Sequence, residues 1–117
     1  MATQEDIALR LSAQRALLGH VPPHVRAVSL DRDDGAHRIW VRFFFDGEPS
    51  ESVRDAAACA GTEILSDYPD EWDVTEEFVV CPAPQQIEHR RLLVYHRCED
   101  SWVTDPSIKA VHDTGGA

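Results

Sequence analysis

The residues from Arg38 to Phe45 constrain the fold more than any other stretch of the chain. Apolar side chains occupy every second position of this stretch, at Ile39, Val41, Phe43 and Phe45. This period of two is typical of a strand with one face buried in the core. The opposite face carries Arg38, Trp40, Arg42 and Phe44. Because it combines two arginines with two aromatic residues, we expect this second face to contact something.

Patterns on either side predict further elements. Apolar residues at helical spacing predict a helix over residues 5–18, which Gly19 ends. Two prolines in Val21–Pro23 then impose an extended connection. Residues 24–30 read as a strand, and the turn Asp31–Gly35 would join it to the 38–45 strand as a hairpin.

A second helix follows directly. Ser50 is suited to be its N-cap and Glu51 to its first turn, and the helical pattern continues to about Ser66. Its inner stripe is rich in small residues, which allows close packing on a sheet: Val53, Ala56, Ala57, Ala60 and Ile64.

Two more strands are predicted over residues 72–81 and 91–97, joined by a loop over 82–90. Val74, Phe78 and Val80 share one face only if Glu76 is turned away or accommodated at a bulge. The order α-β-β-α-β-β predicts an α+β fold, with a four-stranded antiparallel sheet built from two hairpins and both helices packed on one face. We expect residues 1–98 to form a single domain and residues 99–117 a partly flexible C-terminal extension, in which Trp102 could dock onto the sheet.

Length and composition suit one globular domain, since the chain has 117 residues of which 43% are hydrophobic. No apolar run is long enough to span a membrane, and the N-terminus is polar and acidic, so we expect a cytoplasmic location. The three cysteines, Cys59, Cys81 and Cys98, have no C-x-x-C spacing. We therefore expect reduced, mostly buried thiols.

Charge carries the strongest functional information in the composition. The formal net charge is −10, and Lys109 is the single lysine, which argues against nucleic-acid binding. The acids cluster near predicted turns, in residues 31–34, 46–51 and 67–77. Such clusters could converge into one negative surface that attracts a basic partner, or they could simply keep the protein soluble.

The sequence gives little indication of catalysis or metal binding. The six histidines form no H-x-x-x-H motif on a helix, and His96 with Cys98 offers at most two metal ligands. Cys59 lies among alanines in the middle of a predicted helix, where a thiolate is not stabilised. The glycines form no phosphate-binding loop. We expect no metal, no cofactor and no catalytic residues.

Three segments carry a family resemblance: residues 17–28 with Leu17-Leu18-Gly19 and Val25–Val28, residues 41–50 with the run VRFFFDGEPS, and residues 62–69 with Asp67-Tyr68-Pro69. Together they resemble small bacterial immunity proteins of the contact-dependent growth inhibition type, over roughly residues 9–97. The resemblance implies a binding protein without catalysis that neutralises a cognate toxin domain in the cytoplasm, a nuclease being one expected toxin type.

The sequence thus predicts an immunity protein whose acidic surface binds a basic toxin domain. The residues expected to contact it are eight acids and one aromatic anchor: Asp46, Glu48, Asp67, Asp70, Glu71, Asp73, Glu76, Glu77 and Trp40. One alternative is a homodimeric structural or regulatory domain that uses the exposed sheet face. A small enzyme is the other.

Overall fold

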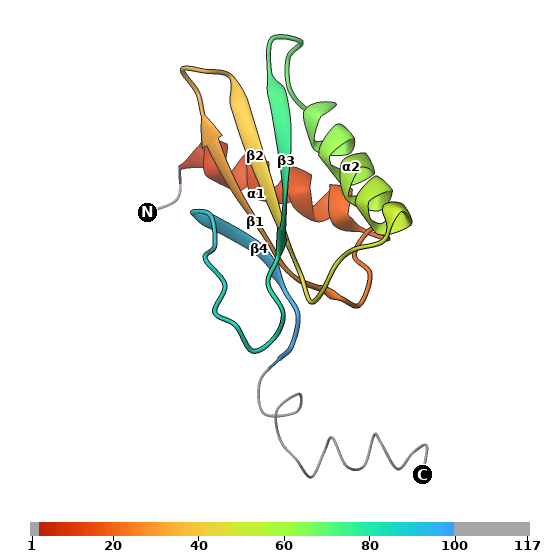
Figure 1. The fold of residues 1–117 in the computed structure, drawn as a ribbon. Helices are drawn as coiled ribbons and strands as arrows, with labels where there is room; N and C mark the ends of the chain where they lie inside the picture. The colour runs from red at the N-terminus through yellow and green to blue at the C-terminus, as the bar shows by residue number, and fades with distance from the viewer. Residues whose placement is uncertain (1–2, 100–117) are drawn as a thin grey trace, which may run out of the picture.

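A computed structural model describes residues 3–99 of the chain. Six elements follow the predicted order (Figure 1): α1 (Gln4–Leu17), β1 (Val25–Asp33), β2 (Arg38–Phe45), α2 (Glu51–Leu65), β3 (Asp73–Val80) and β4 (Leu92–His96). The predicted α+β class is therefore confirmed. Predictions about residues 100–117, including the docking of Trp102, lie outside the described residues.

Both helices begin at side-chain caps. At α1 the Thr3 hydroxyl accepts a hydrogen bond from the Asp6 amide at 3.1 Å, and the Asp6 carboxylate accepts one from the Thr3 amide at 3.3 Å. This reciprocal capping box satisfies two amides that the helix itself leaves unpaired. At α2 the Ser50 hydroxyl accepts from the Val53 amide, as its position before an acidic first turn predicts.

The four strands form one sheet in the order β3-β2-β1-β4. β1 pairs antiparallel with both β2 and β4, whereas β2 and β3 are parallel. The prediction of a wholly antiparallel sheet is wrong for this one pair, because α2 carries the chain back along the sheet before β3 begins. The predicted second hairpin is also wrong, since β3 and β4 occupy opposite edges.

Both helices cover the same face of the sheet, as predicted. The core joins α1 residues such as Leu9 and Ala13, α2 residues such as Ala60 and Ile64, and the inward side chains of β1 and β2. In Figure 1, α1 lies behind the sheet and α2 beside β3. The alternating apolar residues of β2 are all at most 1% exposed, which confirms the assignment of its faces.

The hairpin differs in detail from the prediction. β1 continues to Asp33, so the turn lies at Asp34–His37 and not at Asp31–Gly35. Asp31, Arg32 and Asp33 pair with Trp40, Ile39 and Arg38 as regular ladder residues. Ladder pairing with β2 has therefore extended β1 through residues whose composition favours a turn.

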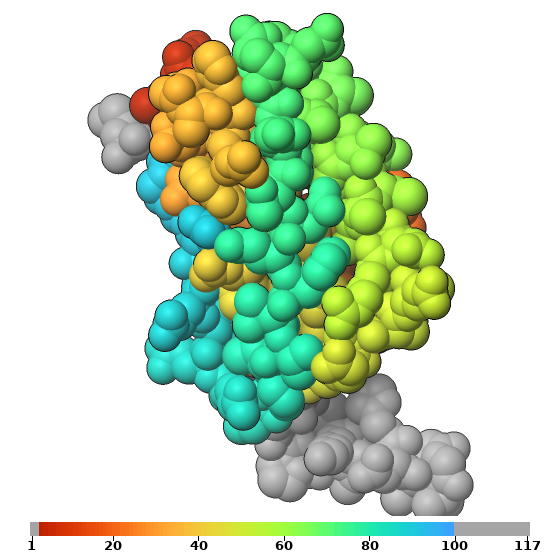
Figure 2. Space-filling view, turned by 45° about the horizontal axis from the view of Figure 1, so that its top comes forward, coloured from red at the N-terminus to blue at the C-terminus, as the bar shows by residue number. Residues whose placement is uncertain are grey.

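The sheet face opposite the helices is covered by the chain itself. Segment 82–91, which runs from the end of β3 to β4, lies on this face, where Ile87 packs beside Phe44. The His89 ring meets the Phe44 ring edge-on at 5.6 Å, and the Arg90 guanidinium lies 5.0 Å from the centre of the Trp40 ring. Figure 2 views the molecule from the side of β3, with the segment that follows it below. Phe44 is consequently only 2% exposed.

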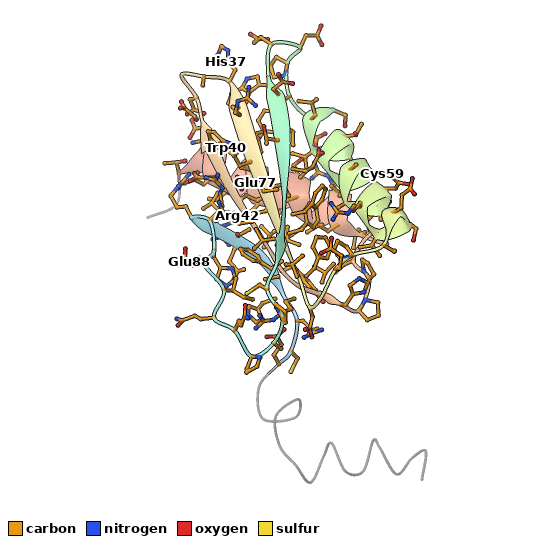
Figure 3. The ribbon with its side chains drawn as sticks, in the orientation of Figure 1. His37, Trp40, Arg42, Cys59, Glu77 and Glu88 are labelled. Carbon is orange, nitrogen blue, oxygen red and sulfur yellow. The ribbon has the colours of Figure 1, made fainter. Side chains whose placement is uncertain are left out.

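The cysteines do not share one environment. Cys81 is buried, but Cys59 and Cys98 are exposed. The expectation of mostly buried thiols is therefore wrong for two of the three. Cys59 stands among alanines, yet Figure 3 shows it on the side of α2 away from the sheet.

No helix within residues 3–99 has the length and apolar character to cross a membrane.

Candidate functional site

The acidic residues expected at the site lie in several different environments. Glu77, on the outer face of β3, binds two arginines (Figure 3 shows Arg42 nearby). Its carboxylate accepts two hydrogen bonds from Arg90, both at 2.9 Å, and one from Arg42 at 3.0 Å. The Arg90 hydrogen bonds contribute most to lowering the Glu77 pKa to about 2. Glu77 thereby helps to hold segment 82–91 on the sheet.

Asp46 and Glu48 follow β2 at the other end of the sheet. Asp46 accepts hydrogen bonds from Arg97 at 2.9 Å and from the Ala83 amide at 3.0 Å, and these bonds, Arg97 first, lower its pKa. Glu48 pairs with Arg54 at 2.8 Å on the surface. Both carboxylates therefore already have internal cationic partners.

Glu76 lies on the helix-facing side of β3. The side chain packs against Gly61 of α2, where a Cβ atom would come within 2.2 Å of a Glu76 carboxylate oxygen. Burial raises the pKa of Glu76. Glu76 is neither turned away from this face nor accommodated at a bulge, because β3 keeps a continuous register with β2. Because Gly61 of α2 has no side chain, the Glu76 carboxyl group fits on a strand face that is otherwise apolar.

The remaining acids gather at one end of the sheet. Asp70, Glu71 and Asp73 are exposed in the loop after α2 and at the start of β3. The Asp73 amide donates to the His37 carbonyl at 2.9 Å, which joins this loop to the β1–β2 turn. Figure 2 shows the turn and the loop side by side. Asp33 at the end of β1 and Asp34 in the turn are also exposed, so the acidic end comprises Asp33, Asp34, Asp70, Glu71 and Asp73.

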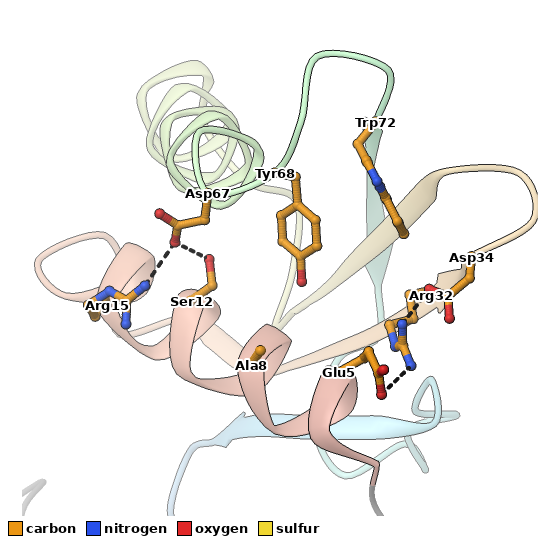
Figure 4. A pocket seen from close by; sticks show the side chains of 9 residues that line it. All are labelled: Glu5, Ala8, Ser12, Arg15, Arg32, Asp34, Asp67, Tyr68 and Trp72. Carbon is orange, nitrogen blue, oxygen red and sulfur yellow. Dashed lines mark hydrogen bonds and ion pairs between the residues drawn. The ribbon is translucent and has the colours of Figure 1, made fainter.

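A groove opens beside the acidic end, between α1 and the loop after α2 (Figure 4). Its volume is about 490 Å³. Tyr68 and Trp72, whose ring centres are 5.1 Å apart, form its aromatic wall. The groove is lined by Glu5, Ala8, Ser12, Arg15, Arg32, Asp34, Asp67, Tyr68 and Trp72.

Asp67 is the expected site residue that lies in this groove. One carboxylate oxygen, Oδ2, accepts both the Ser12 hydroxyl at 2.6 Å and an Arg15 N–H at 2.9 Å. These two bonds, Ser12 first, lower the Asp67 pKa, so the residue is ionised at neutral pH. The side chain is still 42% exposed and remains available to a ligand.

Buried ion pairs lie beneath the groove, formed by residues that were not predicted from the sequence. Asp6 is 1% exposed and accepts hydrogen bonds from Arg32 at 3.0 Å and from Arg91 at 2.9 Å. These bonds, those of Arg91 first, hold the Asp6 pKa well below its usual range. The Thr3-x-x-Asp6 spacing was the available signal, because it is compatible with a capping box that would fix this carboxylate at the start of α1.

Trp40 lies on the sheet face opposite the helices, half-buried beneath Arg90. The groove is lined by α1 on the other side of the sheet, so Trp40 does not lie in it. Cys98 lies beyond the end of β4, so His96 and Cys98 do not share a strand face. Within residues 3–99, no three His, Cys, Asp or Glu side chains come together in a way that could hold a metal ion.

The exposed carboxylates at one end of this small α+β fold suit the binding of a positively charged protein partner. Comparison with family models specifies the class: the model of the MafI2 immunity protein matches residues 6–99. The chain belongs to the MafI2 immunity protein family. None of the curated proteins searched matches it.

Membership in this family indicates the partner and the role of the chain. Proteins of this family provide immunity to polymorphic toxins, so the chain has a cognate toxin as partner and acts by neutralising it. Immunity proteins are generally not catalysts, and the chain is not an enzyme. The resemblance found in the sequence is therefore confirmed for an immunity protein, while the contact-dependent inhibition type stays a prediction.

Proposed function

We propose that the chain neutralises its toxin in the cytoplasm by binding a basic toxin domain with the acidic end and the adjoining groove. The main observation that supports this proposal is that five exposed carboxylates from two segments lie at one end of the sheet. A concentrated negative field accelerates encounter with a positively charged partner and disfavours acidic ones. A toxin delivered by contact-dependent inhibition fits this scheme.

Nuclease domains are one toxin type that suits such a surface. Proteins that bind nucleic acid present clustered lysines and arginines to the phosphate backbone. An acidic immunity protein would compete for the same basic surface and exclude the nucleic acid. Of the expected contacts, this proposal gives most weight to Asp70, Glu71 and Asp73, which have no ion pair within residues 3–99, and to Asp67, which pairs with Arg15 but stays 42% exposed. Glu77 and Asp46 are held by internal arginines and are less exposed.

Association kinetics test the proposal. The double variant Asp70→Asn/Asp73→Asn should bind the cognate toxin domain about tenfold more slowly at low salt, with a nearly unchanged dissociation rate. Raising the salt to about 0.5 M should remove most of the difference, because exposed charges are then screened.

The variant Glu51→Gln/Asp55→Asn is the matched control. It removes the same two charges from exposed positions at the far end of α2. Its association rate should remain close to that of the native chain. Equal rates for the two variants at low salt would contradict binding through the acidic end.

A further inference from the structure

The groove beside the acidic end has space and chemistry that the internal contacts of the chain leave unused. Ala8 of α1 lies exposed along it, and this small side chain leaves the space in front of Tyr68 and Trp72 open. Figure 4 shows the Tyr68 ring between Asp67 and Trp72. A long, flat side chain from a partner would meet aromatic surface on one side and helix α1 on the other.

Two acceptors in the groove lack partners among residues 3–99. Both hydrogen bonds to Asp67 fall on Oδ2, so its Oδ1 atom accepts none from that part of the chain. The half-buried Tyr68 hydroxyl has no hydrogen bond there either. Figure 4 shows this hydroxyl extending toward α1. Each group can accept an N–H from a ligand.

The charge balance of the groove favours a cation. Three carboxylates line it, those of Glu5, Asp34 and Asp67. Its two arginines are already paired, Arg15 with Asp67, and Arg32 with the buried Asp6 as well as with Glu5 and Asp34 at the surface. Although both contact Arg32, the side chains of Glu5 and Asp34 are 64% and 60% exposed, so they can also turn toward an incoming charge.

We infer that the groove receives one arginine side chain of the toxin domain, stacked on Tyr68 and Trp72 and hydrogen-bonded to Asp67. The inference rests on the proposed function and adds the group that anchors the complex. A guanidinium is flat, stacks on aromatic rings and donates several hydrogen bonds in one plane, whereas a lysine ammonium does not stack in this way.

Filling the groove tests the inference without removing any internal contact. Ala8→Arg places a guanidinium in the groove, and Gln14→Arg adds the same charge to an exposed position of α1 outside it. The Ala8→Arg complex with the cognate toxin domain should dissociate at least about tenfold faster than the native complex. The Gln14→Arg complex should stay within about twofold. Thermal unfolding of both variants checks that the fold is intact.

An arginine-to-lysine scan of the toxin domain identifies which arginine binds in the groove. One such replacement should speed dissociation from the native chain but not from Ala8→Arg, since the groove of that variant is already occupied. Native binding with equal dissociation rates for the two chain variants would overturn the arginine site and leave the proposed function standing. No binding by the native chain would overturn both.

Discussion

At the scale of single residues, buried arginines hold the irregular segments in place. Arg26 of β1 is 4% exposed and binds the Glu99 carboxylate with two N–H groups, at 2.8 and 2.7 Å. It also donates to the carbonyls of Cys81 and Gln85 at 2.7 and 2.8 Å. One side chain thus connects a central strand with segment 82–91 and with the residues after β4.

Replacing Glu99 by glutamine should therefore destabilise the fold. Glu99→Gln leaves the Arg26 charge buried without its counterion, and we expect the free energy of unfolding to fall by about 3 kcal/mol. Glu48→Gln is the matched control, because Glu48 pairs with Arg54 at the surface, and it should cost less than about 1 kcal/mol. Urea unfolding measures both. Equal losses would contradict a special role for the buried pair.

The carboxylate of Glu77 makes stability depend on pH. Its pKa falls from the ordinary 4.5 to about 2 in the folded chain, so between these values the unfolded chain binds more protons. The stability that it contributes is complete above about pH 4.5 and is lost as the pH falls toward 2. Glu77→Gln should make urea midpoints between pH 6 and 3 less dependent on pH. A slope identical to that of the native chain would contradict this account.

At the scale of elements, α2 and β3 fit together through Gly61. Glycine disfavours the middle of a helix by about 1 kcal/mol relative to alanine, so its presence on the buried face of α2 has a packing reason. That reason is the Glu76 side chain, which occupies the space that a Cβ atom would need.

A double-mutant cycle tests this fit. In the native background, Gly61→Ala should bring no gain in stability, because the Glu76 carboxyl group must move. In the Glu76→Ala background the same change should stabilise the protein by about 1 kcal/mol. Urea unfolding of the four chains gives the coupling. Equal effects of Gly61→Ala in both backgrounds would show that the two residues do not compete for space.

The same elements show what local sequence determines. Alternation in residues 38–45 and the Ser50 cap gave the correct faces and helix start, because both depend on neighbours in the chain. The parallel β2–β3 pairing was not evident, since it depends on how α2 crosses the sheet. Nor was the covering of the outer face by segment 82–91, because it depends on long-range contacts such as that of Arg90 with Glu77.

At the scale of the whole molecule, the distribution of charge matters more than the net charge of −10. The sequence identified the acidic clusters but could not separate carboxylates with internal partners from free ones. Glu77 and Asp46 are bound by Arg90 and Arg97, whereas Asp70 and Asp73 have no ion pair within residues 3–99. Only the fold brings the β1–β2 turn and the loop after α2 together at one end.

Amide hydrogen exchange of the full chain, with and without its cognate toxin domain, can show directly whether the acidic end binds the toxin domain. Binding through the acidic end predicts slower exchange in residues 31–37 and 67–73 when the toxin domain is present, with little change in residues 51–58 or 82–91. Protection confined to residues 82–91, on the face opposite the helices, would contradict the account.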